Sequence, residues 1–258
     1  MRLIVVEPMR TTKSRGMLLL LAYSLSAVVA GAAAEAEAET IPKAPVSDTI
    51  TELLETIRVR HGFPALAAAV VVDGEIVATN AVGIRKQGGP ETVTVRDRFH
   101  IGSVTKSMTA TLAAMLVEQG KISWTTTLGE SFSGSGDPIH PEYGEVTLEQ
   151  LLAHRGGAPA SPPMDLWMKA WEGKGAPQEQ RREFVRGLLA RKPEATPGTR
   201  KIYSNQGYAI AGVRLEKAAG KAWEDLMRTM LFEPLEMRSA GFGAPATPHA
   251  VDQPWGHI

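Results

Sequence analysis

The 258-residue chain is 43% apolar, 22% charged and 6% aromatic, and its 28 basic and 28 acidic residues leave no formal net charge. This length suits one large domain or two small ones, and it is enough to bury a core. The absence of cysteine excludes disulfide scaffolds, thiolate metal sites and cysteine nucleophiles, and no basic excess indicates nucleic acid binding. Because the six histidines form no HExxH or HxH pair, we expect neither a metal nor a cofactor.

The first 34 residues have the three parts of a secretory signal peptide. Arg10, Lys13 and Arg15 precede an uncharged stretch over 16–34, which ends in three alanines that match an A-x-A cleavage site. The alternative is an uncleaved membrane anchor, because this stretch is just long enough to span a bilayer. Both interpretations send the rest of the chain out of the cytoplasm, so we expect a secreted or periplasmic protein. Residues 35–47 are predicted to be a polar linker.

The next segment is predicted to form a helix followed by a β-hairpin. Ser47 or Asp48 can cap a helix that runs to about His61. Two β-rich runs, 66–72 and 75–82, flank Asp73-Gly74, which is a strong hairpin signal. The first run is apolar on both faces, so we expect helices to cover both sides of that strand.

The rest of the chain is predicted to be mainly helical. Thr147 and Gln150 form a capping box, and glycines such as Gly120 and Gly220 follow helix ends. The expected helices cover 103–119, 147–154, 178–191, 205–219 and 222–231. A leading helix, a hairpin and a block of helices indicate an α+β fold, with an antiparallel sheet flanked by helices and an all-helical region.

The first motif with chemical meaning is Ser103-Val104-Thr105-Lys106. Residues three apart share a helix face, so the Lys106 amine can take the proton of the Ser103 hydroxyl if its pKa is lowered. The alternative is a serine that caps the helix, with a solvated lysine in the first turn. Chance alone supplies about 0.5 such S-x-x-K motifs in this chain, so the motif is weak by itself.

The second motif is Tyr203-Ser204-Asn205, and it is the rarer of the two, with about 0.03 chance occurrences. A tyrosine oxygen can relay a proton between nucleophile and leaving group, and an amide can hydrogen-bond a substrate carbonyl. The alternative is a half-buried Tyr203 at a strand–helix junction, with Asn205 as the N-cap of the helix that follows.

Two further sets of residues have a structural and a functional interpretation. His154 can be a base, but no carboxylate partner lies near it in the sequence, so we expect a structural histidine that fixes its loop. Trp167, Trp171 and Trp223 can line a substrate pocket, although tryptophans at helical spacing are more often core residues.

The motifs in order resemble the serine β-lactamase and penicillin-binding-like superfamily, most closely the branch related to class C β-lactamases, which also holds esterases and D-amino-acid peptidases. The resemblance runs from about residue 48 to the end. It implies a nucleophile at Ser103, a base at Lys106, a catalytic Tyr203 and a substrate-binding Asn205. Four stretches carry it: 99–106 (FHIGSVTK), 151–157 (LLAHRGG), 197–208 (PGTRKIYSNQGY) and 232–237 (FEPLEM).

One feature of the family pattern is absent from the sequence. The family has a third motif, K-T-G or H-x-G, on a late strand, and none follows Tyr203. We therefore expect a domain over 48–258 that is incomplete at its C-terminus and lacks late sheet strands, which would leave the Ser103 N–H as the one donor of the oxyanion pair. Loss of one such donor typically costs about 2.7–4 kcal/mol of transition-state stabilisation.

Three hypotheses about function follow. The first is an exported serine hydrolase that forms an acyl-enzyme on Ser103 with an amide, ester or β-lactam, including D-Ala peptides. The second is a non-catalytic binding module for cell-wall peptide with the same fold. The third is a fragment that does not fold alone. The three catalytic groups do not discriminate among the substrates.

Overall fold

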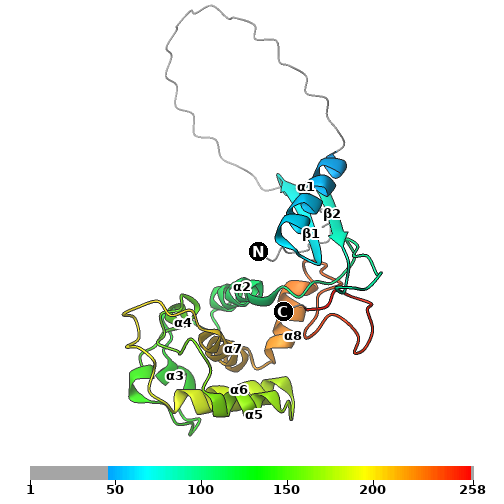
Figure 1. Ribbon diagram of the computed structural model, residues 1–258. Coiled ribbons are helices and arrows are strands. Elements are labelled where there is room, and N and C mark those ends of the chain that lie inside the picture. Colours follow the sequence, from blue (N-terminus) through cyan, green and yellow to red (C-terminus); the bar gives the residue numbers. More distant parts are fainter. Residues whose placement is uncertain (1–45, 257–258) are drawn as a thin grey trace, which may run out of the picture. The chain divides into compact units, whose positions relative to one another are not determined.

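The computed structural model describes residues 46–256, so the predicted signal peptide and most of the predicted linker lie outside the described residues. The described chain divides into two compact units (Figure 1). Residues 46–99 and 245–256 form the first unit, and residues 100–244 form the second. Between residues 46 and 256, no helix combines the length and the apolar character needed to span a membrane.

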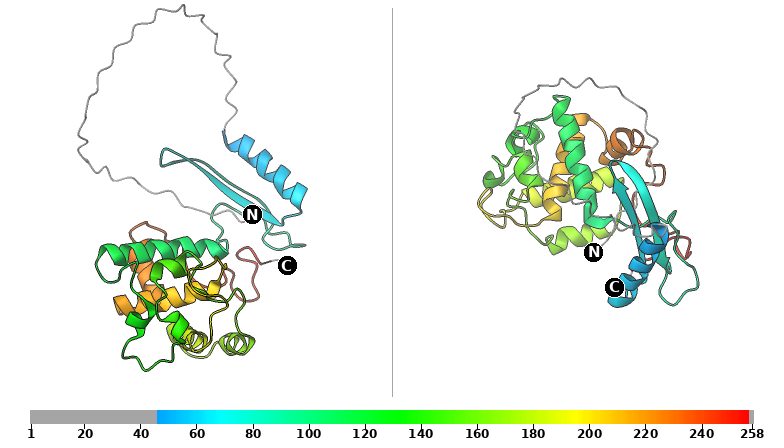
Figure 2. Two further views of the ribbon diagram at one scale, coloured as in Figure 1. Left: turned by 90° about the vertical axis from the view of Figure 1, so that its left-hand side faces the viewer. Right: turned by 90° about the horizontal axis from the view of Figure 1, so that it is seen from above.

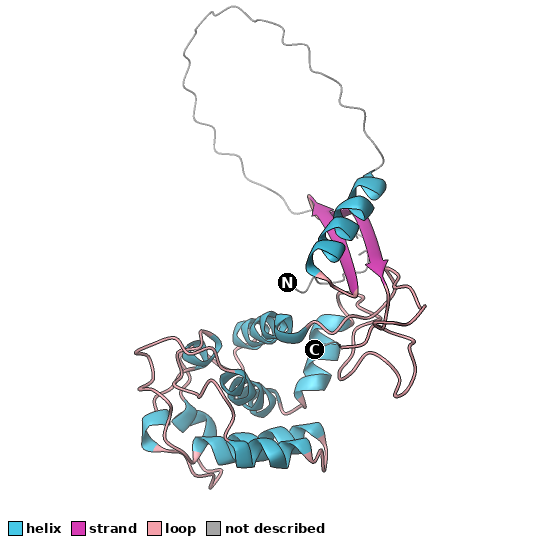
Figure 3. Cartoon of the chain, in the orientation of Figure 1, coloured by secondary structure: helices cyan, strands magenta, loops and turns pink. Residues whose placement is uncertain are grey.

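The first unit consists of one helix, α1 (Val46–His61), and a hairpin of β1 (Ala65–Val72) and β2 (Glu75–Gly83) (Figure 3). Helix α1 begins one or two residues before the predicted cap. The antiparallel register pairs Ala65 with Gly83 and Val72 with Glu75. Asp73 and Gly74 have φ values of 50° and 82°, the left-handed geometry that a two-residue hairpin turn needs. The predicted hairpin is therefore confirmed.

The prediction that helices cover both sides of β1 is wrong for the described chain. Val70, Val71 and Val72 are 38%, 55% and 50% exposed, whereas Leu66 and Ala67 are buried. Helix α1 packs against the hairpin, and the described sheet has two strands. A two-stranded sheet with one covering helix has too little structure to enclose both faces of an apolar strand.

The second unit is helical and has α7 (Asn205–Ala219) at its centre, where α2 (Thr105–Glu118), α4 (Leu148–Leu152), α6 (Pro177–Leu189) and α8 (Trp223–Met227) pack against it (Figure 2). Helices α3 (Leu128–Phe132) and α5 (Met164–Trp171) complete the set, and α5 packs on α6. Short 3-10 turns cover Gly102–Val104 and Pro141–Tyr143, and a π turn over Arg228–Phe232 continues α8. The predicted α+β class is confirmed.

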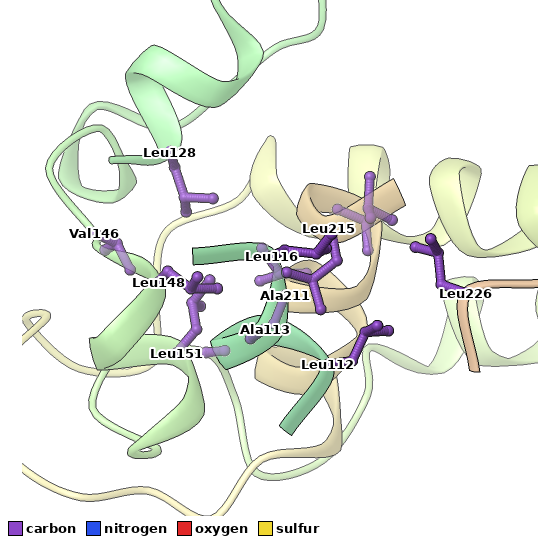
Figure 4. Close-up of a cluster of buried hydrophobic side chains, with 14 of the residues drawn as sticks. Leu112, Ala113, Leu116, Leu128, Val146, Leu148, Leu151, Ala211, Leu215 and Leu226 are labelled. Atoms are coloured by element: carbon purple, nitrogen blue, oxygen red, sulfur yellow. The ribbon is translucent and has the colours of Figure 1, made fainter. Parts of the chain in front are cut away.

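The core of the second unit joins the helices that later prove to hold the candidate site. Figure 4 shows Leu112, Ala113 and Leu116 of α2 beside Ala211 and Leu215 of α7. All five side chains are fully buried. Burial of each large aliphatic side chain contributes about 1.5–3 kcal/mol, so this contact fixes α2 against α7.

Most helix ends follow the local sequence signals. Thr147 and Gln150 form the predicted capping box on α4, with both reciprocal hydrogen bonds present. Gly120 and Gly220 end α2 and α7 with φ values of 68° and 69°, as expected for residues that follow a helix in the left-handed conformation. These ends depend on interactions within three or four residues, which is why sequence alone locates them.

Candidate active site

Ser103 lies in the 3-10 turn that leads into α2, one turn before Lys106. Its side chain is exposed and caps neither the turn nor the helix. Ser103 Oγ instead accepts a hydrogen bond from Lys106 Nζ at 3.1 Å and another from the Tyr203 hydroxyl at 2.7 Å. The interpretation of Ser103 as a helix cap beside a solvated lysine is therefore wrong.

Lys106 connects the two sequence motifs. Its Nζ donates to Ser103 Oγ and, at 2.6 Å, to Asn205 Oδ1. The same nitrogen lies 4.8 Å from the ring centre of Tyr203 and 5.6 Å from that of Tyr208. Lys106 is half-buried, and its immediate surroundings are aromatic and polar.

Tyr203 lies just before α7 and points its hydroxyl at the nucleophile candidate. The side chain is 52% exposed. The Lys106 ammonium and then the Ser103 hydroxyl lower the pKa of the Tyr203 phenol, because each stabilises the phenolate. A phenol with a lowered pKa exchanges a proton with a neighbouring hydroxyl more readily than an isolated one does.

Asn205 does not cap α7, which corrects the structural interpretation of this residue. Ser204 is the N-cap, and its Oγ accepts from the Gly207 N–H at 3.0 Å and donates to the Pro159 carbonyl at 2.6 Å. Asn205 is the first helical residue, so its amide is available to accept from Lys106. Ser204 and Asn205 are both residue types that cap helices, and only the backbone geometry shows which of them does so.

His154 occupies the structural role that was expected of it. Its Nδ1 accepts a hydrogen bond from the Ser204 N–H at 3.1 Å, and its carbonyl accepts from the Ile202 N–H at 2.8 Å. Its ring lies 4.6 Å from the Tyr203 ring. Burial, and then the positive charges of Lys106 and Lys201, lower the pKa of His154. This contact with Tyr203 was not predicted from the sequence.

A cavity of about 390 Å³ extends from Ser103 along α2 and α7. Its wall includes Lys106, Asn205, Arg181 and Trp223. The Arg181 guanidinium is held by two carboxylates, with Glu216 Oε1 at 2.5 Å and Glu224 Oε2 at 2.9 Å. Burial would lower the pKa of Arg181, but these two carboxylates raise it overall. The cavity wall therefore holds a nucleophile candidate and a guanidinium that is paired with two carboxylates.

The tryptophans have different positions from one another. Trp223 lines the cavity and also packs, partly buried, against the core, so its position agrees with both interpretations. Trp167 and Trp171 are 45% and 77% exposed on α5, so the expectation that they are core residues is wrong. Their spacing gives α5 one apolar face, but periodicity does not reveal whether a neighbouring element covers that face.

No trio of histidine or acidic side chains within residues 46–256 is arranged to bind a metal ion. The arrangement of Ser103, Lys106 and Tyr203 suits nucleophilic catalysis, because a hydroxyl within hydrogen-bond reach of an amine and a phenol can lose its proton as it attacks.

Known proteins are similar to this chain in sequence and in fold. A family model described as Beta-lactamase matches residues 46–257. Penicillin-binding protein 4 of Amycolatopsis lactamdurans is 30% identical over 189 residues, which cover 73% of this chain and 47% of that protein. The octameric penicillin-binding protein homologue of Pyrococcus abyssi is 27% identical with a TM-score of 0.60, and the match covers 74% of this chain and 43% of that one.

A third relative is the D-amino acid amidase of Ochrobactrum anthropi SV3, which is 25% identical with a TM-score of 0.60 over 74% of this chain and 50% of that one. The chain thus spans about half or less of the length of these relatives. The family model covers most of this chain, and the matched structures have the predicted fold. The resemblance in the motifs is confirmed, and the chain belongs to the Beta-lactamase family.

Proposed function

We propose that this protein is an exported serine hydrolase that forms an acyl-enzyme on Ser103. A general hydrolase role is supported by the relatives, which include proteins described as a β-lactamase and as a D-amino acid amidase. The observation that carries the proposal is the pair of hydrogen bonds to Ser103 Oγ, from Lys106 Nζ at 3.1 Å and from the Tyr203 hydroxyl at 2.7 Å.

The proposed reaction begins with attack of Ser103 Oγ on the carbonyl carbon of an amide, ester or β-lactam. As the C–O bond forms, the Ser103 proton moves to whichever partner is unprotonated, the neutral amine of Lys106 or the phenolate of Tyr203, and the carbonyl oxygen gains negative charge beside the Ser103 backbone N–H. The same groups then deliver the proton to the leaving nitrogen or oxygen as its bond to carbon breaks. Water, deprotonated by the same pair, frees the acyl group and restores the Ser103 hydroxyl.

Asn205 has two proposed tasks in this scheme. Its Oδ1 accepts from Lys106 Nζ at 2.6 Å, which holds the amine between Asn205 and Ser103. With Oδ1 directed at Lys106, the amide nitrogen of Asn205 is left to donate to a substrate carbonyl, the substrate-binding role predicted from the sequence. A small molecule or a peptide with an exposed carbonyl is the expected substrate.

Covalent trapping tests the proposal directly. The full chain is incubated with a fluorophosphonate probe, and intact-protein mass spectrometry measures the increment. We expect one adduct on the wild type and on Ser107→Ala, and none on Ser103→Ala. Ser107 is the matched control because it is an exposed serine one turn along α2, and its Oγ donates to the Val104 carbonyl rather than to the site. Equal labelling of wild type and Ser103→Ala would refute the assignment.

The competing hypothesis of a binding module makes a different prediction in the same series. A module for cell-wall peptide would bind muropeptides, would neither hydrolyse them nor react with the probe, and would lose no binding on substitution of Ser103.

Export is tested separately by fractionation of expressing bacterial cells. A mature protein in the periplasm or medium, shortened by about 34 residues, supports export by a cleaved signal, and a full-length membrane-bound protein supports the anchor.

A further inference from the structure

His154 holds the backbone on both sides of Tyr203. Its carbonyl accepts the N–H of Ile202, and its Nδ1 accepts the N–H of Ser204, at 2.8 and 3.1 Å. Ile202 and Ser204 are both buried, while the side chain of Tyr203 between them is half exposed. One residue therefore binds the backbone N–H of the residue before the tyrosine and that of the residue after it.

The imidazole also contacts the tyrosine ring itself. The two ring centres are 4.6 Å apart and the ring planes are tilted by 35°, so the phenol packs on one face of His154. The His154 ring also contacts Tyr208, with ring centres 5.2 Å apart. The direction of the Tyr203 hydroxyl toward Ser103 is thus set by His154 through both the backbone and the ring.

His154 adopts an unusual conformation in order to make these contacts. Its φ is 60°, in the left-handed region that residues with a Cβ seldom occupy. Its own N–H bonds the Leu151 carbonyl at the end of α4, so the strained residue links α4 to the segment before α7. Strained backbone of this kind concentrates where geometry matters for function.

We infer that His154 is a positioning residue for Tyr203, and that it acts only while its Nδ1 is unprotonated. This inference rests on the proposed function, because it assigns His154 a task in the proton transfer at Ser103. Protonation would place an N–H at Nδ1 against the Ser204 N–H, so two donors would face each other. Ser204 is 2% exposed, so water does not readily replace the lost acceptor.

The charges around His154 favour the unprotonated form near neutral pH. Lys106 on α2 and Lys201 on the segment before α7 are the positive groups that, after burial, lower the pKa of His154. The neighbouring Arg155 directs its guanidinium to the Gly198 carbonyl. The phenols of Tyr203 and Tyr208 are the other titratable groups that pack on the imidazole. On acidification, the expected result is a looser Tyr203 and a slower attack by Ser103.

Two substitutions of His154 separate the contribution of its hydrogen-bond acceptor from that of its side-chain volume. Asn tolerates the left-handed conformation, and its Oδ1 is an acceptor that does not titrate, so His154→Asn keeps the hydrogen bond and removes the proton switch. His154→Leu keeps a bulky side chain and removes the acceptor. We expect the fluorophosphonate labelling rate at pH 8 to fall by about tenfold in His154→Leu, the equivalent of one lost hydrogen bond, and to stay near the wild-type rate in His154→Asn.

The pH dependence of the labelling rate distinguishes the positioning role from a merely structural role, because a merely structural role would not alter it. We expect the labelling rate of the wild type to fall more steeply toward acid pH than that of His154→Asn, because the variant lacks one titrating group. Wild-type rates and an unchanged profile in both variants would overturn the inference. A folded His154→Asn protein with a rate as low as that of His154→Leu would overturn it as well.

A second measurement is independent of the reaction. An NMR pH titration of the Ser103→Ala protein follows the signals of the His154 ring and of the Ser204 amide. The His154 ring signal is assigned by its absence from the spectrum of the double variant Ser103→Ala/His154→Asn. We expect both to titrate with one midpoint, and a Ser204 amide that does not respond would overturn the contact. If no protein is labelled but this titration is observed, the proposed function fails while the hold of His154 on Tyr203 stands. If His154→Leu does not fold, His154→Asn and the titration still decide.

Discussion

Tyr203→Phe removes one oxygen atom and separates a role in chemistry from a role in folding. The Tyr203 hydroxyl donates to Ser103 Oγ, and its ring, which the variant keeps, packs on His154. The side chain is 52% exposed, so the free energy of unfolding should change by less than about 0.5 kcal/mol. The labelling rate should fall by about 10²–10⁴-fold, the usual contribution of a positioned acid–base group, or roughly 3–5 kcal/mol of activation free energy.

Tyr143→Phe is the matched control, because it removes the same atom from the opposite environment. Tyr143 is fully buried, and its hydroxyl has no hydrogen-bond partner among the described residues. Burial raises the pKa of this phenol well above its usual value, and the negative charge of Glu194 adds to the shift. Removal of an unpartnered buried hydroxyl recovers its desolvation cost, so we expect a gain of about 1–2 kcal/mol in stability and an unchanged labelling rate.

The two variants are compared with wild type by urea unfolding and by fluorophosphonate labelling of the full chain. We expect Tyr203→Phe to label more slowly with unchanged stability, and Tyr143→Phe to label at the wild-type rate with increased stability. The argument fails if Tyr203→Phe labels at the wild-type rate, or if it loses more than about 2 kcal/mol of stability, since that would make the phenol a structural group. A loss of stability in Tyr143→Phe would show that its hydroxyl is satisfied after all.

Three further predictions concern stability. Ser204→Ala removes the N-cap of α7 and should lower the free energy of unfolding in urea by about 1–2 kcal/mol; no change would contradict the cap. Gly157→Ala should lower the thermal unfolding midpoint far more than Gly134→Ala. Both glycines have positive φ, but a Cβ at Gly157 would lie 2.5 Å from a backbone oxygen, whereas a Cβ at Gly134 would meet open space. Equal decreases of the midpoint in the two variants would refute the clash at Gly157. Burial would raise the pKa of Asp97, but the Arg85 guanidinium lowers it below its unfolded value. This carboxyl therefore stabilises the fold above about pH 4, and the stabilisation is lost as pH falls through the folded pKa. Asp97→Asn should make the free energy of unfolding less dependent on acid pH, and an unchanged acid dependence would argue against the ion pair of Asp97 and Arg85.

The first unit shows where local sequence is sufficient and where it is not. Asp73-Gly74 predicted the hairpin turn, because two residues with positive φ are required there and few residue types supply them. The apolar run over 66–72, which precedes this turn, predicted a strand correctly and its covering incorrectly. Strand propensity belongs to the segment itself, whereas burial depends on which other elements reach it.

The candidate site divides in the same way. Spacing paired Ser103 with Lys106, since three residues make about one helical turn, and the rarity of the second motif identified Tyr203 and Asn205. Sequence did not reveal that Ser204 rather than Asn205 caps α7, because both residue types are good caps. Nor did it reveal that the two α5 tryptophans are exposed, because a helical period marks an apolar face without identifying what lies against it.

The sequence by itself determined the hairpin and most of the helices, although not α3 or α5, together with the two motifs and the residue types that can do acyl-transfer chemistry. These features depend on neighbours within about one turn of helix or one hairpin. Only the tertiary structure decided that Tyr203 reaches Ser103 across 100 residues of chain, and that His154 holds both sides of that tyrosine. The physical reason is packing: the buried contact between α2 and α7 brings the motifs together, and no local interaction encodes which helix faces which.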